Sequence, residues 1–466
     1  MQQPGDIVLV SCYEPGHQPQ GVASAVAFLR RAGFAPTCLD LAVDELDAAA
    51  EARLAAARLV TISVPMHTAM ALGLRVAARV RAANPTAHVC FFGLYAVLNR
   101  DLLLSRSKVA DSVLAPDSEA QLVSIASGAS GGAAVVAPPG RRDDLVPARD
   151  GLPALERYAR LAIAGERRVA GHAQTTRGCK HMCRHCPIPP VYGGRFFAVP
   201  ADVVLDDVRR QVAAGARHID FGDPDFLNGP NHALRVARAV HAEHPDLTFS
   251  FTAKVEHIVA HEDVVRELRG LGALFVVSAV ESLSDRVLAA LAKGHLAVDV
   301  ARALAVVRGA GMSLRPTFVA FTPWTTLADY LTLCNFIRDN RLQDEVDPVQ
   351  LSIRLLVPPG SLLLAAPDIA PHLGPLDPEA LTYRWTHPDP RMDQLEADVS
   401  ALVEAAAEAG APAADTFARI HHVAATVAGI ELPPEKPRIR LSAPPPHLTE
   451  PWFCCAQPTR RQLRAV

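Results

Sequence analysis

The sequence predicts an α/β protein with two parallel-sheet units arranged one after the other. Apolar runs of strand length alternate with amphipathic segments of helix length, both before and after a stretch rich in Gly, Ser and Pro. Half of the 466 residues are hydrophobic, and the formal net charge is −3. A large core can therefore form, and the nearly balanced charge gives no indication of a nucleic-acid partner.

Residues 1–126 are expected to form the first unit. Strands are expected at 7–12, 36–41, 58–64, 87–92 and 109–114, with helices near 21–32, 46–56 and 67–83. Apolar strands that alternate with helices form a parallel sheet covered on both faces, so we expect a doubly wound, flavodoxin-like domain. Ligands of such sheets bind beyond the carboxyl ends of the strands, where His17, Ser63 and Gly93 stand.

Residues 127–150 are expected to be a linker, and residues 151–364 to form the second unit. Its strands are expected at 171–176, 217–222, 247–253, 274–280, 314–321 and 350–357, with helices at 202–214, 231–243, 262–270, 284–293 and 297–309. Six such units predict an open six-stranded β/α barrel, because a complete eight-unit barrel normally needs about 250 residues. Residues 365–466 should form a Pro-rich connection, two helices at 393–409 and 413–428, and an irregular tail.

Three cysteines follow the first expected strand of the barrel: Cys179, Cys183 and Cys186, spaced CxxxCxxC. Thiolates are the soft ligands that iron–sulfur clusters require. Three local thiolates leave one iron of a 4Fe–4S cluster free to bind a substrate or cofactor. Zinc is the alternative, since His181 and His185 lie in the same loop, although structural zinc usually takes paired C-x2-C sets. A disulfide framework is disfavoured, because nine cysteines without a signal peptide suggest a reducing compartment.

The motif, with His185 directly before the last cysteine, resembles the signature of the radical S-adenosylmethionine (SAM) enzymes. The resemblance implies a 4Fe–4S cluster on the three cysteines, with His185 beside the cofactor, and SAM bound at the open iron. Reductive cleavage of SAM would give a 5′-deoxyadenosyl radical that abstracts hydrogen from a small-molecule substrate. An external electron donor of flavodoxin or ferredoxin type is implied as well.

Two further stretches resemble this family. Asp223 and Asp225 stand after the second barrel strand, where many members use Gly-Gly-Glu to hold the SAM amino group. A carboxylate there can bind an ammonium group, and Asp223 could equally cap the following helix. Ser278 and Glu281 begin a run that resembles VES…SDxVL…KGH, which makes both candidates for SAM contacts. The alternative for that run is a helix cap with a surface charge.

The first unit resembles the cobalamin-binding domain of cobalamin-dependent radical SAM enzymes, because it directly precedes the cysteine motif. The cobalt-ligating pattern Asp-x-His-x-x-Gly is absent, with Pro15 in place of the aspartate. His17 is either a cobalt contact or an ordinary loop residue. Ser63 and Gly93 match the small residues that let a corrin tail approach. With cobalamin, methyl transfer to carbon is expected; without it, this domain would be a platform for a substrate or partner.

The tail Phe453-Cys454-Cys455-Ala-Gln457-Pro resembles an uncharacterised radical SAM group named for a Cys-Cys-Ala-Glu-Pro tail, with Gln457 as a departure. Some members carry selenocysteine at the second cysteine. The resemblance implies that Cys455 is a reactive thiol and Cys454 its resolving partner. The rival hypothesis is a non-enzymatic iron–sulfur protein that transfers electrons or senses.

No run of about 18 apolar residues and no basic N-terminal region are present. A cytoplasmic protein without a membrane partner is therefore expected.

Overall fold

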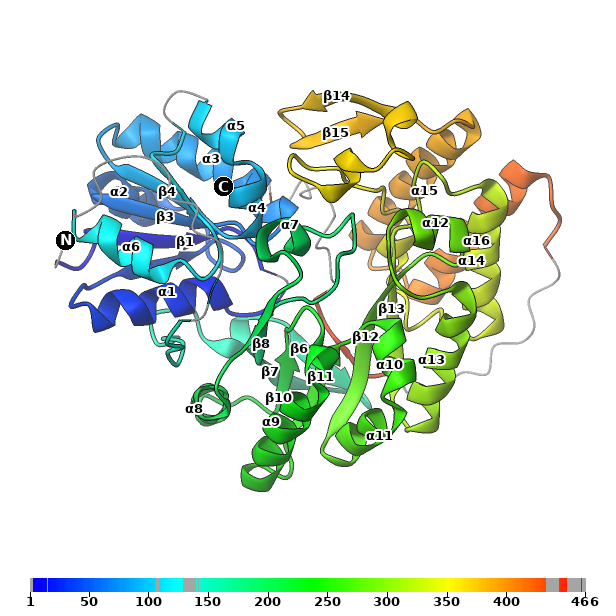
Figure 1. Cartoon of the computed structure of the whole chain (residues 1–466), viewed down its shortest axis with the longest axis horizontal. Coiled ribbons are helices and arrows are strands. Elements are labelled where there is room, and N and C mark those ends of the chain that lie inside the picture. The colour runs from blue at the N-terminus through cyan, green and yellow to red at the C-terminus, as the bar shows by residue number, and fades with distance from the viewer. Residues whose placement is uncertain are drawn as a thin grey trace.

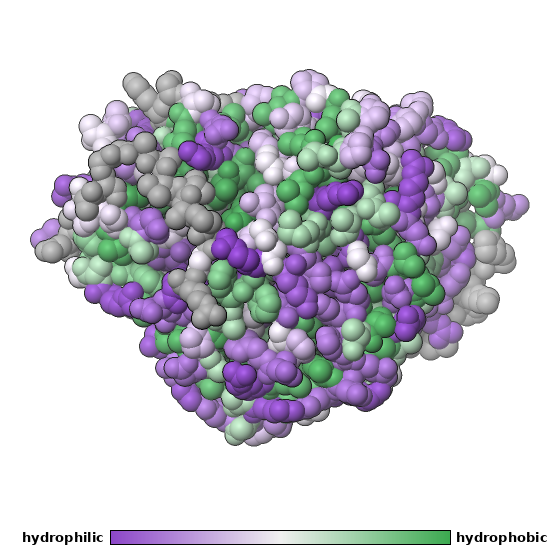
Figure 2. Space-filling model, viewed as in Figure 1, coloured by the Kyte–Doolittle hydropathy of each residue, from purple (hydrophilic) through white to green (hydrophobic). Residues whose placement is uncertain are grey.

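The computed structural model contains two α/β bodies side by side, with a smaller C-terminal part packed on the second body (Figure 1). The structure describes residues 3–14, 16–105, 109–128, 140, 142–432, 444–450 and 462. No helix among these residues is long and apolar enough to cross a membrane. Hydrophilic and hydrophobic residues are interspersed over the face shown in Figure 2, with a hydrophilic area near its middle.

The first body is a five-stranded parallel sheet with the strand order β2-β1-β3-β4-β5. Its strands are β1 (Ile7–Ser11), β2 (Thr37–Asp40), β3 (Leu59–Ser63), β4 (His88–Phe92) and β5 (Ser112–Leu114). Its helices are α1 (Gln20–Arg31), α2 (Ala48–Ala56), α3 (His67–Ala83), α4 (Leu94–Leu98), α5 (Arg100–Ser105) and α6 (Glu119–Ala126). This order is that of flavodoxin-like sheets, whose ligands bind where the order reverses, between β1 and β3. The predicted fold class is confirmed.

The second body is an open half-barrel. Its seven-stranded sheet has the order β13-β12-β11-β10-β7-β6-β16, and the neighbours from β7 to β13 are parallel. The seven strands are β6 (Arg160–Ile163), β7 (Glu166–Ala173), β10 (His218–Phe221), β11 (Thr248–Thr252), β12 (Ala273–Glu281), β13 (Ser313–Phe318) and β16 (His447–Leu448). The helices are α8 (Ala201–Ala213), α9 (Pro230–Glu243), α10 (Val255–Ala260), α11 (Glu262–Gly270), α12 (Asp285–Ala290), α13 (Ala297–Gly309) and α14 (Leu327–Asp339). Phe221, Phe251 and Val276 belong to the buried core shared with these helices.

The sixth barrel strand, expected at 350–357, is reduced to one parallel bridge between Phe321 and Arg354. A 3-10 helix occupies Pro348–Leu351. The backbone after it turns to the C-terminal part, because Tyr383 N donates to Val357 O over 2.8 Å. The Arg354 guanidinium lies over the ring of Trp385, 3.6 Å from its centroid. These contacts take the place of further strand pairing.

The C-terminal part contains an antiparallel hairpin, β14 (Leu373–Asp377) and β15 (Thr382–Trp385), within the stretch expected to be a Pro-rich connection. Two helices follow, α15 (Pro390–Glu408) and α16 (Ala413–Ala428), close to their expected positions. The short strand β16 (His447–Leu448) then pairs with β6. It returns the chain to the edge of the half-barrel that lies nearest the first body.

Residues 142–150, expected to be part of a linker, form a strap packed between the two bodies. Arg149 donates to Asp207 of α8 over 2.7 Å, to Gln20 of α1 over 2.6 Å and to the carbonyl of His172 in β7 over 2.8 Å. Beyond the strap, Tyr158 donates a 2.6 Å hydrogen bond to Asp40 of the first body. The strap is a fixed structural element, because buried charged side chains need such partners.

Candidate cluster and cofactor site

The cysteine loop projects from a short antiparallel ribbon formed by β8 (Thr176–Gly178) and β9 (Phe196–Ala198). Helix α7 (Ile188–Tyr192) closes the loop before the chain returns to β9. Gly178 has a φ of +76°, and a Cβ there would lie 2.5 Å from Arg195 O and from the Tyr192 ring. Only glycine fits this position. The ribbon therefore directs Cys179, Cys183 and Cys186 into one compact loop.

The three thiols form one buried donor set. Cys179 and Cys183 are 8% and 7% exposed, and Cys186 is half-buried. Burial raises the pKa of the Cys179 and Cys186 thiols, and the neighbouring cysteines raise it further. Adjacent buried thiolates are stable only when a cation binds them. Three thiolates of one loop suit an iron–sulfur cluster with one iron left open.

The histidines of the loop have partners outside the thiol set. His185 Nε2 lies 3.1 Å from Glu281 Oε1, and His181 Nδ1 lies 3.0 Å from Glu256 Oε1. These contacts disfavour a zinc site made from the three cysteines and a histidine of the same loop. Asn228 was not anticipated from the sequence; its amide oxygen lies 3.8 Å from Cys179 Sγ. Asn is common in loops, and nothing in the sequence pattern distinguished it.

Glu281, a predicted site residue, lies at the end of β12 and is 7% exposed. Its Oε1 contacts His185 Nε2 at 3.1 Å and Lys293 Nζ at 3.2 Å. Burial opposes ionisation, yet Lys293 and then His185 lower the pKa of Glu281 to about 2. Its φ of +68° is unusual for a residue with a side chain, and such backbone strain is typical of functional sites. The structure thus joins Glu281 to the cysteine loop.

Ser278, the other candidate on this strand, faces away from the barrel interior. Side chains alternate along a strand, and Ser278 shares its face with Val276 and Val280, which belong to the core shared with the covering helices. Its hydroxyl is fully buried and has no hydrogen-bond partner among the described residues. His295 offers a second unsatisfied group, because both ring nitrogens are buried without a described partner.

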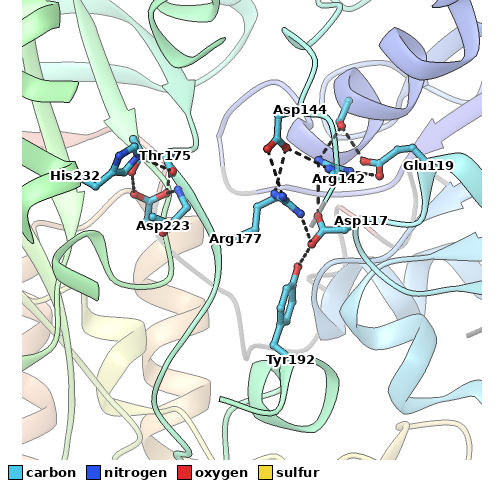
Figure 3. A network of polar contacts seen from close by, with 11 residues as sticks. Asp117, Glu119, Arg142, Asp144, Thr175, Arg177, Tyr192, Asp223 and His232 are labelled. Carbon is cyan, nitrogen blue, oxygen red and sulfur yellow. Dashed lines mark hydrogen bonds and ion pairs between the residues drawn. The ribbon is translucent and has the colours of Figure 1, made fainter. Parts of the chain in front are cut away.

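The two acidic candidates after β10 are held by protein groups. Asp223 accepts hydrogen bonds of 2.7 Å from Thr175 N and Thr176 N, and a further one from the Thr175 hydroxyl (Figure 3). It therefore fastens the turn that leads into β8, while burial raises its pKa to about 7. Asp225, not Asp223, makes the local cap, since its Oδ1 accepts from Leu227 N over 3.0 Å.

A polar network between the two bodies contacts the residues before and after the cysteine loop (Figure 3). Asp117, in the turn after β5, lies 2.8 Å from Arg177 of β8 and accepts a 2.8 Å hydrogen bond from the Tyr192 hydroxyl of α7. Arg142 of the strap pairs with Glu119 of α6. No pattern in the sequence indicated these residues, because their pairing depends on how the two bodies meet.

The candidates of the first body lie at the carboxyl edge of its sheet but not in one group. The His17 ring stacks on His172 of β7, with 3.6 Å between centroids and 6° between planes. A Cβ on Gly93 would lie 2.9 Å from Val64 O, so its glycine is explained by backbone packing. Ser63 is buried against the start of α1. Protein contacts account for all three, and none of these contacts indicates a corrin ligand.

Cys454 and Cys455 lie outside the described residues. The nearest described part of the chain, ahead of them, ends at Glu450, whose carboxylate accepts a 3.3 Å hydrogen bond from the Tyr13 hydroxyl. Glu450 therefore lies beside the loop that carries His17.

The arrangement has relatives among known proteins. The family model described as the radical SAM superfamily matches residues 173–325. A tRNA-2-methylthio-N(6)-dimethylallyladenosine synthase of Chlorobium phaeovibrioides is 26% identical over an alignment that covers 42% of this chain and 53% of that enzyme. Alignments with three curated relatives span between 33% and 53% of the length of those proteins.

Two solved structures share the fold. The cobalamin-dependent SAM radical enzyme OxsB, with aqua-cobalamin and SAM bound, has a TM-score of 0.68 at 13% identity, over 87% of this chain and 67% of that chain. The radical SAM methyltransferase TsrM of Kitasatospora setae has a TM-score of 0.57 at 17% identity, over 71% of this chain and 70% of that chain. The likeness to OxsB covers both bodies. Residues 173–325 of this chain are thus a radical SAM domain.

Proposed function

We propose that this protein cleaves SAM reductively at a 4Fe–4S cluster held by Cys179, Cys183 and Cys186, and acts on a small-molecule substrate. The observation that carries the proposal is the buried set of three thiols on a rigid ribbon at the mouth of a half-barrel. A cluster bound there would supply the electron that breaks the SAM carbon–sulfur bond. An external donor of flavodoxin or ferredoxin type would first reduce the cluster.

The surrounding residues hold the loop and receive the ligand. Glu281 stays ionised between His185 and Lys293, which fixes the end of the loop against β12. Asp223 fixes its beginning through residues 175 and 176. The unsatisfied ring nitrogens of His295 are available to a polar ligand such as the SAM amino acid group or ribose. With both oxygens of Asp223 occupied, we assign it to positioning.

Cobalamin-dependent methyl transfer is the second candidate. It is supported by the strand order of the first body and by the likeness to OxsB over both bodies. The contacts of His17 and Gly93 assign them no corrin role, so this candidate rests on the fold. Without cobalamin, the first body would be a platform for a substrate or partner.

The proposal extends to Cys454 and Cys455, and it rests there on the tail motif of the sequence. We propose Cys455 as a reactive thiol with Cys454 as its resolving partner.

The test uses anaerobically purified, cluster-reconstituted protein given SAM and dithionite, with cobalamin offered. We expect a brown protein that releases 5′-deoxyadenosine, and no release from Cys183→Ala. A brown protein inert to SAM would point to electron transfer or sensing, and a colourless one to zinc. Corrin absorbance retained after gel filtration would support the methyl-transfer candidate. Cys455→Ser should keep cluster assembly and SAM cleavage but lose the product formed from the substrate.

A further inference from the structure

A second group of metal-ligating side chains lies beside the cysteine loop and is separate from the thiols. It contains His181 of that loop, Asp225 after β10, and His257 of α10. His257 Nδ1 lies 2.6 Å from Asp225 Oδ2, and His181 Nε2 lies 3.7 Å from the same oxygen. The two imidazole rings are 4.8 Å apart between centroids. Asp225 Oδ2 therefore lies near one ring nitrogen of each histidine, and Glu256 lies beside the same two histidines.

These three atoms are buried and have no hydrogen-bond partner among the described residues. Asp225 is fully buried, and the side chains of His257 and His181 are 8% and 18% exposed. The close approach of His257 to Asp225 thus lacks the geometry of a hydrogen bond. Buried polar atoms without partners are rare, and a bound water or ion is one established explanation for them. A cation between the three atoms would satisfy all of them.

The surroundings orient these atoms as they are oriented in metal sites. His181 Nδ1 lies 3.0 Å from Glu256 Oε1, which in turn lies 2.9 Å from Lys254 Nζ. A ligating histidine usually donates its other ring N–H to a carboxylate, which leaves the ligating nitrogen unprotonated. Asp225 Oδ1 is engaged by Leu227 N, so Oδ2 is the free oxygen. Both ligand orientation and outer contacts are in place.

We propose that His181 Nε2, His257 Nδ1 and Asp225 Oδ2 bind one divalent first-row metal ion, with Zn²⁺ as the best match. Two imidazole nitrogens and one carboxylate oxygen are ligands that Zn²⁺ accepts, and three protein ligands leave one position open. Metal bonds of about 2.0–2.2 Å place neighbouring ligand atoms about 3–3.5 Å apart. The observed 2.6 and 3.7 Å lie on either side of this range. The ion would tie the cysteine loop to α10, whether or not a cluster is bound.

The first test removes the competing thiols of the loop. The full-length variant Cys179→Ala/Cys183→Ala/Cys186→Ala is stripped with chelator and titrated with Co²⁺. We expect one Co²⁺ per chain, with visible ligand-field bands, no sulfur-to-metal charge-transfer band, and displacement by Zn²⁺. In the same background, Asp225→Asn and His257→Ala should each weaken Zn²⁺ binding by about 100-fold. Asp225→Asn keeps an oxygen that accepts from Leu227 N, so weaker Zn²⁺ binding in this variant would not come from loss of the helix cap.

The control is His261→Ala, which removes a neighbouring ring, 5.9 Å from that of His257, that is not a ligand. It should leave the affinity unchanged. No bound Co²⁺, only sulfur-ligated Co²⁺, or equal affinity in all variants would overturn the site and leave two His–carboxylate ion pairs.

The second test keeps the cluster and decides the question if the triple variant does not fold. Metal content is measured on reconstituted full-length protein by mass spectrometry. We expect one zinc per chain beside the iron, and loss of zinc with retention of iron in His257→Ala. Equal zinc in wild type and His257→Ala would overturn the proposal. Because zinc and iron are counted separately, loss of this site is distinguished from loss of the cluster on which the proposed activity depends.

Discussion

Glu281, at the end of β12, binds the cysteine loop through its contact with His185. Its buried carboxylate faces His185 and Lys293 at 3.1 and 3.2 Å. Removing one partner of a buried ion pair leaves an uncompensated charge, which costs about 3–5 kcal/mol. Glu281→Gln should therefore lower the free energy of unfolding by a few kcal/mol, about 3, and reduce the iron retained after reconstitution. Urea unfolding and iron analysis measure the two effects.

The matched control is Glu267→Gln, which breaks the exposed pair with Arg238. Exposed pairs contribute about 0–1 kcal/mol, so this variant should unfold like wild type. If the two variants unfolded at the same urea concentration and retained equal iron, the fixing role of Glu281 would be wrong.

Sequence reasoning at this scale identified types of residue better than their directions. Cys179, Cys183, Cys186, His185 and Glu281 are brought together as expected. Ser278 does not join this group. Its direction could not be predicted, because the strand has apolar residues on both faces and the pattern does not reveal which face points inward. Likewise, the cap considered for Asp223 is made by Asp225, because the turn between the two residues decides which carboxylate reaches Leu227 N.

At the scale of elements, the β8–β9 ribbon decides where the thiols lie. Gly178→Ala would place a Cβ 2.5 Å from a backbone oxygen at a φ of +76°. Neither atom can move without shifting the ribbon, so we expect loss of most cluster binding and a clear fall in melting temperature. Iron content and circular dichroism on heating measure this.

Gly193→Ala is the control that separates the steric clash at Gly178 from the cost of placing alanine at a positive φ. Gly193 has a φ of +60°, but a Cβ there would meet nothing within 4 Å. This variant should cost only about 1 kcal/mol and keep the cluster. Equal loss of iron in both variants would show that the close approach at Gly178 is not what matters.

The regular elements were predictable because each carries its own apolar pattern. The helices expected at 67–83, 262–270 and 297–309 occur with those bounds. The β8–β9 ribbon and the β14–β15 hairpin were not predicted. Their strands are only three to five residues long, and partner contacts rather than local periodicity determine such short strands.

At the scale of the whole molecule, the sequence predicted two units but not how they meet. The expected linker contains Arg142 and Arg149, whose ion pairs reach α6 and α8. Arg149 also donates a hydrogen bond to Gln20 of α1. Gly, Ser and Pro in its first half predicted a spacer, because composition reports local flexibility and not docking. The charged second half of the linker, residues 142–150, packs between the two bodies.

The last prediction concerns this junction, where His17 stacks on His172. Burial, and then His172, lower the pKa of His17 from 6.5 to about 3. The unfolded chain therefore binds a proton that the folded chain refuses, so the contribution of His17 is lost as pH falls from about 6.5 toward 3. Between about pH 7 and pH 5 the loss is about 2 kcal/mol. The groups that face His17 are His172, Asp220, Arg149 and Glu14.

Glu14 acts in the opposite direction, because burial raises its pKa to about 8 and favours the folded state as pH falls. The effect of His17 must therefore be read as a difference between proteins. His17→Phe keeps a ring against His172 but cannot take a proton, so it should lose about 2 kcal/mol less than wild type between about pH 7 and pH 5. Urea unfolding at both pH values measures this. His422→Gln, at an exposed position of α16, should match wild type at each. If His17→Phe follows the wild-type curve, His17 titrates freely and the two bodies are not held together by its burial.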